Sequence, residues 1–237
     1  MLLAFLILYL LLHEWSKCSQ KNNFYLDSFL FFLICFFVIF FISKISTFAL
    51  VISSVFWLFF SFLLLNNQYK KYAFISFNNL FIKYIVIFGF FISIFTLLNN
   101  SFSIGINNFY LILILIFSTA ISDSFAYIIG SNIGKLSLLS DISPNKTIEG
   151  LFGGLIATLI FGYFLTKNTD LEYEFMFIVF ICSVFGFVGD YFVSLLKRRS
   201  GLKDTGSILP GHGGILDRID SHLASFPISS LILILIY

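Results

Sequence analysis

Long apolar runs, separated by short polar stretches, occupy nearly the whole chain. We count eight: 1–12, 28–42, 47–65, 80–98, 109–130, 150–166, 175–196 and 221–237. A membrane hydrocarbon core about 30 Å thick is crossed by a helix of roughly 20 apolar residues, and most of these runs approach that length. The pattern predicts an all-α, polytopic membrane protein with about eight transmembrane helices, whose polar cytoplasmic loops form the site.

The composition agrees with a membrane protein. Of the 237 residues 59% are hydrophobic and 11% are charged, whereas soluble domains carry about 25% charged residues. We expect one integral domain, in which 1–108 supply N-terminal membrane helices and 109–237 the catalytic membrane region. The net charge of +2 gives no electrostatic footprint for nucleic acid. The three cysteines have neither the number nor the spacing of a disulfide framework or zinc site.

The first apolar run is shorter than a membrane span. Only 12 residues precede His13 and Glu14, and the run lacks the basic start and cleavage site of a signal peptide. We expect either a true start further upstream or a form of the protein with one helix fewer.

Lysine and arginine are distributed unequally between the two sides of the predicted bundle. If the loop 13–27 is inside, the inner side collects Lys17, Lys21, Lys70, Lys71, Lys83, Lys135, Lys146, Lys197, Arg198, Arg199, Lys203 and Arg218. Only Lys44 and Lys167 fall outside. Because cytoplasmic loops retain positive charge, the distribution predicts an inner-membrane protein whose segments 131–149 and 197–220 face the cytoplasm.

The segment 190–220 concentrates charge beyond what a connecting loop needs. It holds nine of the chain's 26 charged residues: Asp190, Lys197, Arg198, Arg199, Lys203, Asp204, Asp217, Arg218 and Asp220. Carboxylates are ligands for Mg²⁺, lysine and arginine neutralise phosphates, and glycines allow close approach of backbone N–H groups to phosphates. Together these residue types indicate phosphoryl or nucleotidyl transfer.

A second polar group begins at Asp123, inside the run 109–130. An ionisable residue within a membrane segment is a candidate functional residue, and a helix-end cap is the alternative. Further along, Ser143 or Thr147 is suited to cap the next helix. Lys146 lies beside that helix start, where an anion is favoured, so capping and phosphate binding both remain open for this segment.

The stretch SLLKRRSGLKDTGSILPGHGGILDRID, residues 194–220, resembles the signature of bacterial phosphatidate cytidylyltransferases. The matching positions are Ser194, Lys197, Arg198, Lys203, Asp204, Gly206, Pro210, His212, Gly213, Gly214, Asp217, Arg218 and Asp220. The groups around Asp123 and Lys146, and the Glu14-Trp15 pair, are also similar to the family. One position departs from it, because Val193 stands where the family commonly has a carboxylate.

The resemblance implies an activity and its partners. The phosphate of phosphatidic acid would attack the α-phosphorus of CTP and release pyrophosphate, giving CDP-diacylglycerol for phospholipid biosynthesis without a protein nucleophile. The implied cofactor is Mg²⁺, with a second cation left open. The implied partners are CTP, phosphatidic acid and membrane lipids but no nucleic acid, and a homodimer is left open.

The resemblance also implies site residues. The catalytic candidates are Asp190, Asp217, Asp123, Lys203, Asp204 and His212. The substrate-binding candidates are Lys146, Ser194, Lys197, Arg198, Gly213, Gly214 and Arg218. The metal-ligand candidates are Asp190, Asp217 and Asp220. Arg199 is interpreted as a juxtamembrane cation near anionic lipid.

Three other functions share some of these features. A CTP-using polyprenol kinase would also need phosphate-binding cations and access to the membrane. A transporter would use the aspartates along an ion pathway, but the polar residues gather in one half of the chain rather than at corresponding places in two halves. A scaffold without activity would not need the intact signature.

Overall fold

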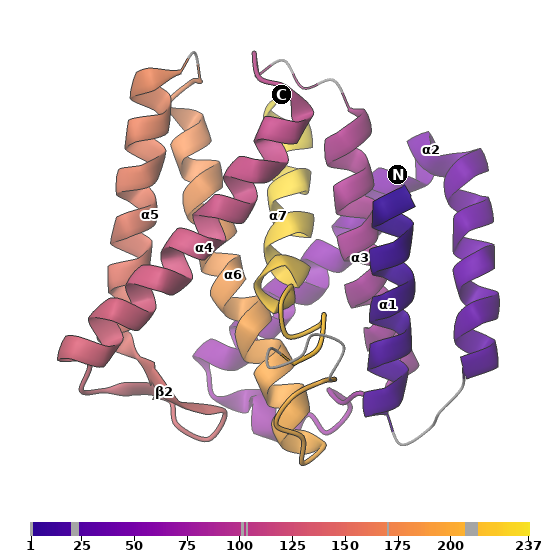
Figure 1. Ribbon diagram of the computed structural model, residues 1–237, viewed down its shortest axis with the longest axis horizontal. Helices are drawn as coiled ribbons and strands as arrows, with labels where there is room; N and C mark the ends of the chain where they lie inside the picture. The colour runs from indigo at the N-terminus through magenta and orange to yellow at the C-terminus, as the bar shows by residue number, and fades with distance from the viewer. Residues whose placement is uncertain (1, 20–23, 101, 103, 170, 207–212) are drawn as a thin grey trace.

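The computed structural model describes residues 2–19, 24–100, 102, 104–169, 171–206 and 213–237 (Figure 1). Helices dominate this part of the chain. Their bounds are α1 Leu2–Cys18, α2 Phe24–Leu65, the 3-10 turn η1 Gln68–Lys71, α3 Leu80–Asn99, α4 Asn108–Ile133, α5 Ile148–Asn168, α6 Glu174–Arg199 and α7 Asp220–Ile236. The strands are β1 Ser137–Leu139 and β2 Ser143–Thr147.

The predicted polytopic membrane architecture agrees with these helices. Five segments of the described chain are long and apolar enough to cross a membrane: Ser46–Leu65, Leu80–Asn99, Asn108–Ile133, Ile148–Asn168 and Glu174–Arg199. The count of eight spans is not confirmed. One reason is α2, whose 42 residues include both of the apolar runs expected at 28–42 and 47–65. At about 1.5 Å per residue such a helix is about twice as long as the hydrocarbon core is thick.

Several helices begin at side chains that the sequence places just before an apolar run. Asn79 accepts hydrogen bonds from the N–H groups of Phe81 and Ile82, and Asn107 accepts one from Phe109. For α5 the cap is Thr147, whose hydroxyl accepts a hydrogen bond from the Gly150 N–H at 3.1 Å. Because these side chains satisfy backbone donors that a helix start leaves unpaired, they fix where α3, α4 and α5 begin.

Two short strands lie within one of the polar connections of this mainly helical chain. β1 and β2 form an antiparallel pair, with Ser137 opposite Thr147 and Leu139 opposite Ser143. The pair lies between α4 and α5, within the polar stretch 131–149. Its strands supply backbone hydrogen bonds where no helix forms, and β2 carries Lys146 into the region where α4 and α5 meet (Figure 1).

The interior is packed with aromatic and aliphatic side chains from both halves of the chain. Phe192 of α6 is fully buried, with ring centroids 5.0 Å from Phe60, 5.1 Å from Trp57 and 6.4 Å from Trp15. These distances are within the range of favourable aromatic pairs. The contacts join α1, α2 and α6, so the N-terminal helices are part of the same core as the charged C-terminal segment.

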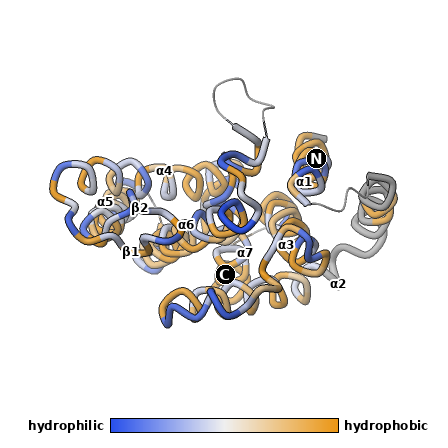
Figure 2. The backbone as a smooth tube through the Cα atoms, turned by 90° about the horizontal axis from the view of Figure 1, so that it is seen from below, coloured by the Kyte–Doolittle hydropathy of each residue, from blue (hydrophilic) through white to orange (hydrophobic). Residues whose placement is uncertain are grey.

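Polar connections gather at one end of the bundle. The β1–β2 pair, the turn around η1 and the connection between α6 and α7 lie at the lower end in Figure 1, and Figure 2 views this end from below. Segments 131–149 and 197–220, which were expected on one side, are therefore at the same end. The connections α3–α4 and α5–α6 lie at the opposite end (Figure 1).

Arg199 has a structural role that was not predicted. Its guanidinium donates hydrogen bonds to three backbone carbonyls after α2, at 2.5 Å to Tyr69 and at 2.7 Å to both Tyr72 and Ile75. Arginine suits this position because its planar fork presents several donors at once. The end of α6 is thereby attached to the turn that precedes α3.

We expect Arg199→Lys to destabilise the protein by about 1–3 kcal/mol, because one ammonium group cannot serve three carbonyls that are spread over seven residues. Thermal unfolding of the purified protein in detergent checks this expectation. Arg198→Lys is the matched control, since Arg198 is exposed and its Nε donates to one carbonyl, that of Ile142, at 3.1 Å. Equal unfolding temperatures for the two variants would contradict the proposed role.

Candidate active site

A cavity of about 670 Å³ opens where α4, α5, α6, α7 and β2 meet at the lower end of the bundle. Charged and polar side chains from α4, β2, α6 and α7 line it, whereas α5 contributes Gly150 and Leu151. The charged and polar side chains include Asp123 and Ser131 of α4, Ser143, Asn145 and Lys146 of β2, Asp190 and Tyr191 of α6, and Asp220 and Ser221 of α7. The cavity thus unites the Asp123 group, the Lys146 group and part of the charged segment 190–220.

Close contact between α6 and α7 brings two of the aspartates to the cavity. A Cβ atom at Gly189 would lie 2.3 Å from the backbone oxygen of Asp220. Only glycine permits this approach, and it sets Asp220, the first residue of α7, beside Asp190. The Asp220 carboxylate accepts a hydrogen bond from the N–H of Ser221, the next residue of α7, at 2.8 Å.

Lys146 is held at the cavity wall by two neighbouring residues of α6. Its ammonium forms an ion pair with the Oδ2 atom of Asp190 and lies 4.6 Å from the centre of the Tyr191 ring. The other oxygen of Asp190 accepts a hydrogen bond from the Ser194 hydroxyl at 3.4 Å. Asp123 accepts one from the Ser221 hydroxyl at 3.3 Å. The lysine side chain is therefore fixed and carries its charge into a cavity that also holds three carboxylates.

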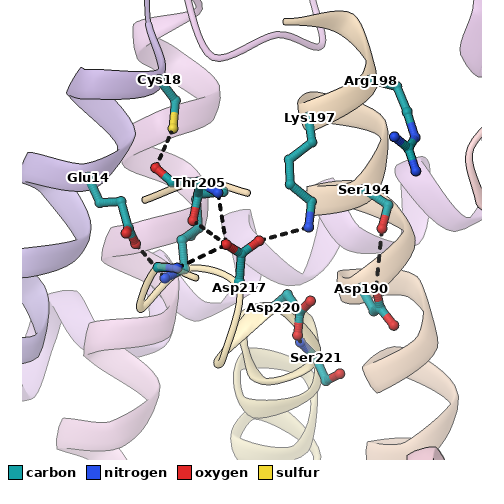
Figure 3. A network of polar contacts seen from close by, with 12 residues as sticks. Glu14, Cys18, Asp190, Ser194, Lys197, Arg198, Thr205, Asp217, Asp220 and Ser221 are labelled. Atoms are coloured by element: carbon teal, nitrogen blue, oxygen red, sulfur yellow. Dashed lines mark hydrogen bonds and ion pairs between the residues drawn. The ribbon is translucent and has the colours of Figure 1, made fainter. Parts of the chain in front are cut away.

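Asp217 belongs to a separate network beside the cavity (Figure 3). Its Oδ1 atom accepts a hydrogen bond from Lys197 Nζ at 2.7 Å. Its Oδ2 atom accepts three more, from the N–H of Thr205 at 2.8 Å, the Thr205 hydroxyl at 3.0 Å and the N–H of Gly214 at 3.1 Å. Asp217 does not line the cavity that holds Asp190, and their joint role as metal ligands stays a prediction.

The electrostatics of Asp217 follow from this network. Burial opposes its ionisation, but the hydrogen bonds from Lys197, Thr205 and Gly214 outweigh burial and hold the pKa of the carboxyl below its ordinary value. The carboxylate is therefore charged at neutral pH and fixes Lys197 in place. The side chains of this ion pair are only 18% and 9% exposed, for Lys197 and Asp217 respectively.

The remaining predicted residues lie around this network rather than in the cavity. Lys203, Asp204 and Arg218 are exposed on the loop between α6 and α7. Gly213 has a positive φ of 80°, and a Cβ there would lie 2.9 Å from Asp217 Oδ2. His212 lies outside the described residues. Val193, the departure from the family pattern, is fully buried in the apolar core.

Sequence reasoning missed four residues of the two networks. Tyr191 and Ser221 line the cavity, Thr205 binds Asp217, and Glu14 of α1 accepts a hydrogen bond from the Leu216 N–H at 2.6 Å. Tyr191, Thr205 and Ser221 each follow directly after an aspartate that was predicted, and this adjacency was the available signal. For Glu14 the signal was the resemblance of the Glu14-Trp15 pair alone, because no spacing rule joins it to residue 216.

The carboxylates of the cavity are of the type that binds Mg²⁺. Within the described residues no group of three or more His, Cys, Asp or Glu side chains is arranged to hold a metal. Mg²⁺ is usually bound by one or two carboxylates together with substrate phosphates and water. Asp190 and Asp220 offer such oxygens at the cavity, whereas Asp217 does not line it and its Oδ2 atom accepts three hydrogen bonds from protein donors.

Apolar helices around a charged cavity at one end define a multi-pass membrane protein with a site for a charged ligand. The chain belongs to the cytidylyltransferase family, whose model matches residues 1–236.

Curated relatives of the chain are phosphatidate cytidylyltransferases. That of Bacillus subtilis is 42% identical over 126 residues, which are 52% of this chain and 46% of the relative. That of Staphylococcus haemolyticus is 46% identical over 118 residues, or 48% of this chain and 45% of the relative. In these alignments the chain spans about half the length of the curated relatives it matches.

Proposed function

We propose that this protein transfers the cytidylyl group of CTP to phosphatidic acid, giving CDP-diacylglycerol and pyrophosphate. The observation that carries the proposal is the cavity, which places one lysine and three aspartates at the end of a bundle of apolar helices. Membership of the cytidylyltransferase family and the names of the relatives support the same reaction.

The location of the cavity suits one lipid and one water-soluble substrate. α4 and α5 are apolar along their length and present exposed side chains such as Phe117, Phe152 and Ile156 to the surroundings of the bundle. At the lower end the same helices border the polar cavity. A phosphatidic acid molecule in the bilayer would thus bring its phosphate to the cavity while its acyl chains stay among lipids.

The reaction needs two polyanions to be held together. The phosphate oxygen of phosphatidic acid attacks the α-phosphorus of CTP, the bond from this phosphorus to the β-phosphate oxygen breaks, and pyrophosphate leaves. Lys146 would bind phosphate oxygens at the cavity wall, and Lys197, fixed by Asp217, would add a second positive charge beside it. Preorganised charges of this kind stabilise the transition state because they need no reorganisation during the reaction.

A divalent cation is part of this proposal. Asp190 and Asp220, with Asp123 nearby, are the residues that would hold Mg²⁺. The ion would neutralise the triphosphate charge and so favour departure of pyrophosphate.

The lower end of the bundle would face the cytoplasm, where CTP is found. Lys70, Lys71, Lys146, Lys197, Arg198 and Arg199 lie on elements at this end, and Lys167 ends α5 at the other (Figure 1). This asymmetry is the one that cytoplasmic loops show in inner-membrane proteins.

An assay with labelled CTP tests the proposed function. Purified protein in mixed micelles with phosphatidic acid and Mg²⁺ is expected to move an α-phosphate label into the lipid fraction and to release an equal amount of pyrophosphate. A label on the γ-phosphate should stay in the aqueous fraction. Transfer of the γ-label to a lipid acceptor would instead indicate a kinase, and no transfer of either label would contradict cytidylyl transfer. Omission of phosphatidic acid is the control for background.

A further inference from the structure

The last turns of α1 contact both ends of the loop between α6 and α7. The Cys18 thiol donates a hydrogen bond to the backbone oxygen of Thr205 at 3.1 Å, and Glu14 Oε2 accepts one from the Leu216 N–H at 2.6 Å. Residues four apart lie on the same face of a helix, so one face of α1 serves both contacts. Figure 3 shows Glu14 and Cys18 beside Thr205, on the side of Asp217 that is opposite Lys197.

Glu14 occupies a recess that two glycines of this loop leave open. Its side chain is buried, with 1% exposure. A Cβ atom at Gly206 would lie 2.1 Å from Glu14 Oε1, and one at Gly214 would lie 1.9 Å from it. A side chain at either position would therefore have to displace the Glu14 carboxylate. A buried carboxylate costs free energy unless it is hydrogen-bonded, so a residue of this type is a costly choice for filling space alone.

The contacts of Glu14 adjoin those that orient Lys197. Gly214 donates its N–H to Asp217, and Asp217 binds Lys197. The N–H of Leu216 donates a hydrogen bond to Glu14, and Leu216 directly precedes Asp217. Through this short chain of contacts the α1 carboxylate fixes the backbone directly before the residue that holds the lysine.

We propose that Glu14 is a positioning residue of the active site, which holds the backbone of Thr205–Gly206 and Gly213–Leu216 so that Asp217 keeps Lys197 in place beside the cavity. The expected change in KM rests on the proposed function. The expected change in loop contacts, which Cys18 labelling measures, does not. Glu14 touches no substrate in this role, and acts through the loop and Asp217.

Kinetic constants separate positioning from a loss of folded protein. Glu14→Ala and Glu14→Asp are expected to raise KM for CTP about tenfold, because a shifted Lys197 binds phosphate less well. Partial unfolding would lower the apparent kcat and leave KM unchanged. Glu14→Gln keeps the length of the side chain and an acceptor for the Leu216 N–H, so it should retain a KM close to that of the wild type. Glu172→Gln, an exposed carboxylate at the other end of the bundle, is the matched control.

Thiol labelling supplies a readout that needs no activity. Cys18 and Cys182 are both buried free thiols, Cys18 against the loop and Cys182 within the core, near the Leu115 oxygen of α4 at 3.6 Å. With labelled sites mapped by mass spectrometry, Glu14→Ala and Glu14→Asp should react with N-ethylmaleimide faster at Cys18 while Cys182 stays protected. If the wild type showed no cytidylyl transfer while Glu14→Ala and Glu14→Asp still reacted faster at Cys18 than the wild type did, the proposed function would be refuted. The positioning role would stand.

Two results would overturn the positioning role. One is a Glu14→Ala protein whose KM for CTP and Cys18 labelling rate both equal those of the wild type. If Glu14→Ala exposes Cys182 as well, that variant has unfolded, and Glu14→Asp is used in its place. An unchanged KM for CTP together with an unchanged Cys18 labelling rate in Glu14→Asp is the second result that would overturn the role.

Discussion

Asp190→Asn is expected to reduce cytidylyl transfer at least about 100-fold. Asp190 is the point at which the cavity's charges meet, because it pairs with Lys146, accepts a hydrogen bond from Ser194 and lies beside Asp220. Its neutral amide would release the lysine and remove one of the two oxygen ligands proposed for Mg²⁺. The initial rate of label transfer from CTP to lipid, at saturating substrates, measures the effect.

The stability of Asp190→Asn should change little. The Lys146–Asp190 pair is only partly buried, with side chains 28% and 22% exposed, so we expect a loss of no more than about 1 kcal/mol. Asp141→Asn is the matched control, because it breaks the exposed Lys70–Asp141 ion pair at the same end of the molecule. We expect it to retain activity within about twofold of the wild type. If Asp190→Asn turned over at the wild-type rate, the cavity would not be the site of the reaction.

Asp217→Asn is expected to lower both activity and stability. The carboxylate accepts hydrogen bonds on both oxygens, and its loss would leave Lys197 without a counter-charge in a largely buried position. Breaking such a pair by removal of one partner costs about 2–3 kcal/mol. Activity should fall at least about tenfold, because Lys197 and the loop are both released. Thermal unfolding and the transfer assay measure the two effects.

The stability cost of Asp217→Asn should depend on pH in a defined direction. Because the folded protein lowers the pKa of Asp217, the ionised carboxylate contributes stability above the ordinary aspartate pKa of about 3.9. This contribution is lost as the pH falls through the lower pKa of the folded state. The difference between wild type and variant should therefore be constant from about pH 5 to 8 and shrink below about pH 4. Asp204→Asn, in the same loop but exposed, should change stability by less than about 0.5 kcal/mol at any of these pH values.

Hydrophobic runs were a sound guide to the helices and a poorer guide to their ends. The predicted runs 80–98 and 109–130 agree closely with α3 and α4, because Asn79 and Asn107 cap these helices. The runs 28–42 and 47–65 were read as two helices because residues such as Ser43 and Lys44 interrupt the apolar pattern. A helix tolerates such residues, and α2 continues through them.

The site was predictable in its composition but not in its pairing. Sequence reasoning placed Asp123, Lys146 and Asp190 in one functional region, and the cavity unites them. The resemblance also grouped Asp217 with Asp190 and Asp220 as metal-ligand candidates, whereas Asp217 lies beside the cavity and not in its lining. What the sequence did not predict is which donors bind each aspartate. Lys197 and Thr205 bind Asp217, and Lys146 binds Asp190. Such choices arise from helix packing and loop geometry, which no local pattern encodes.

The contact between Glu14 and Leu216 also bears on how the protein is made. The two residues are 202 positions apart, so the ribosome synthesises nearly the whole polypeptide between them. Because synthesis proceeds from the N-terminus, the Glu14 carboxylate can meet its partner only after residue 216 has been translated, so this contact between α1 and the segment before α7 is among the last to form.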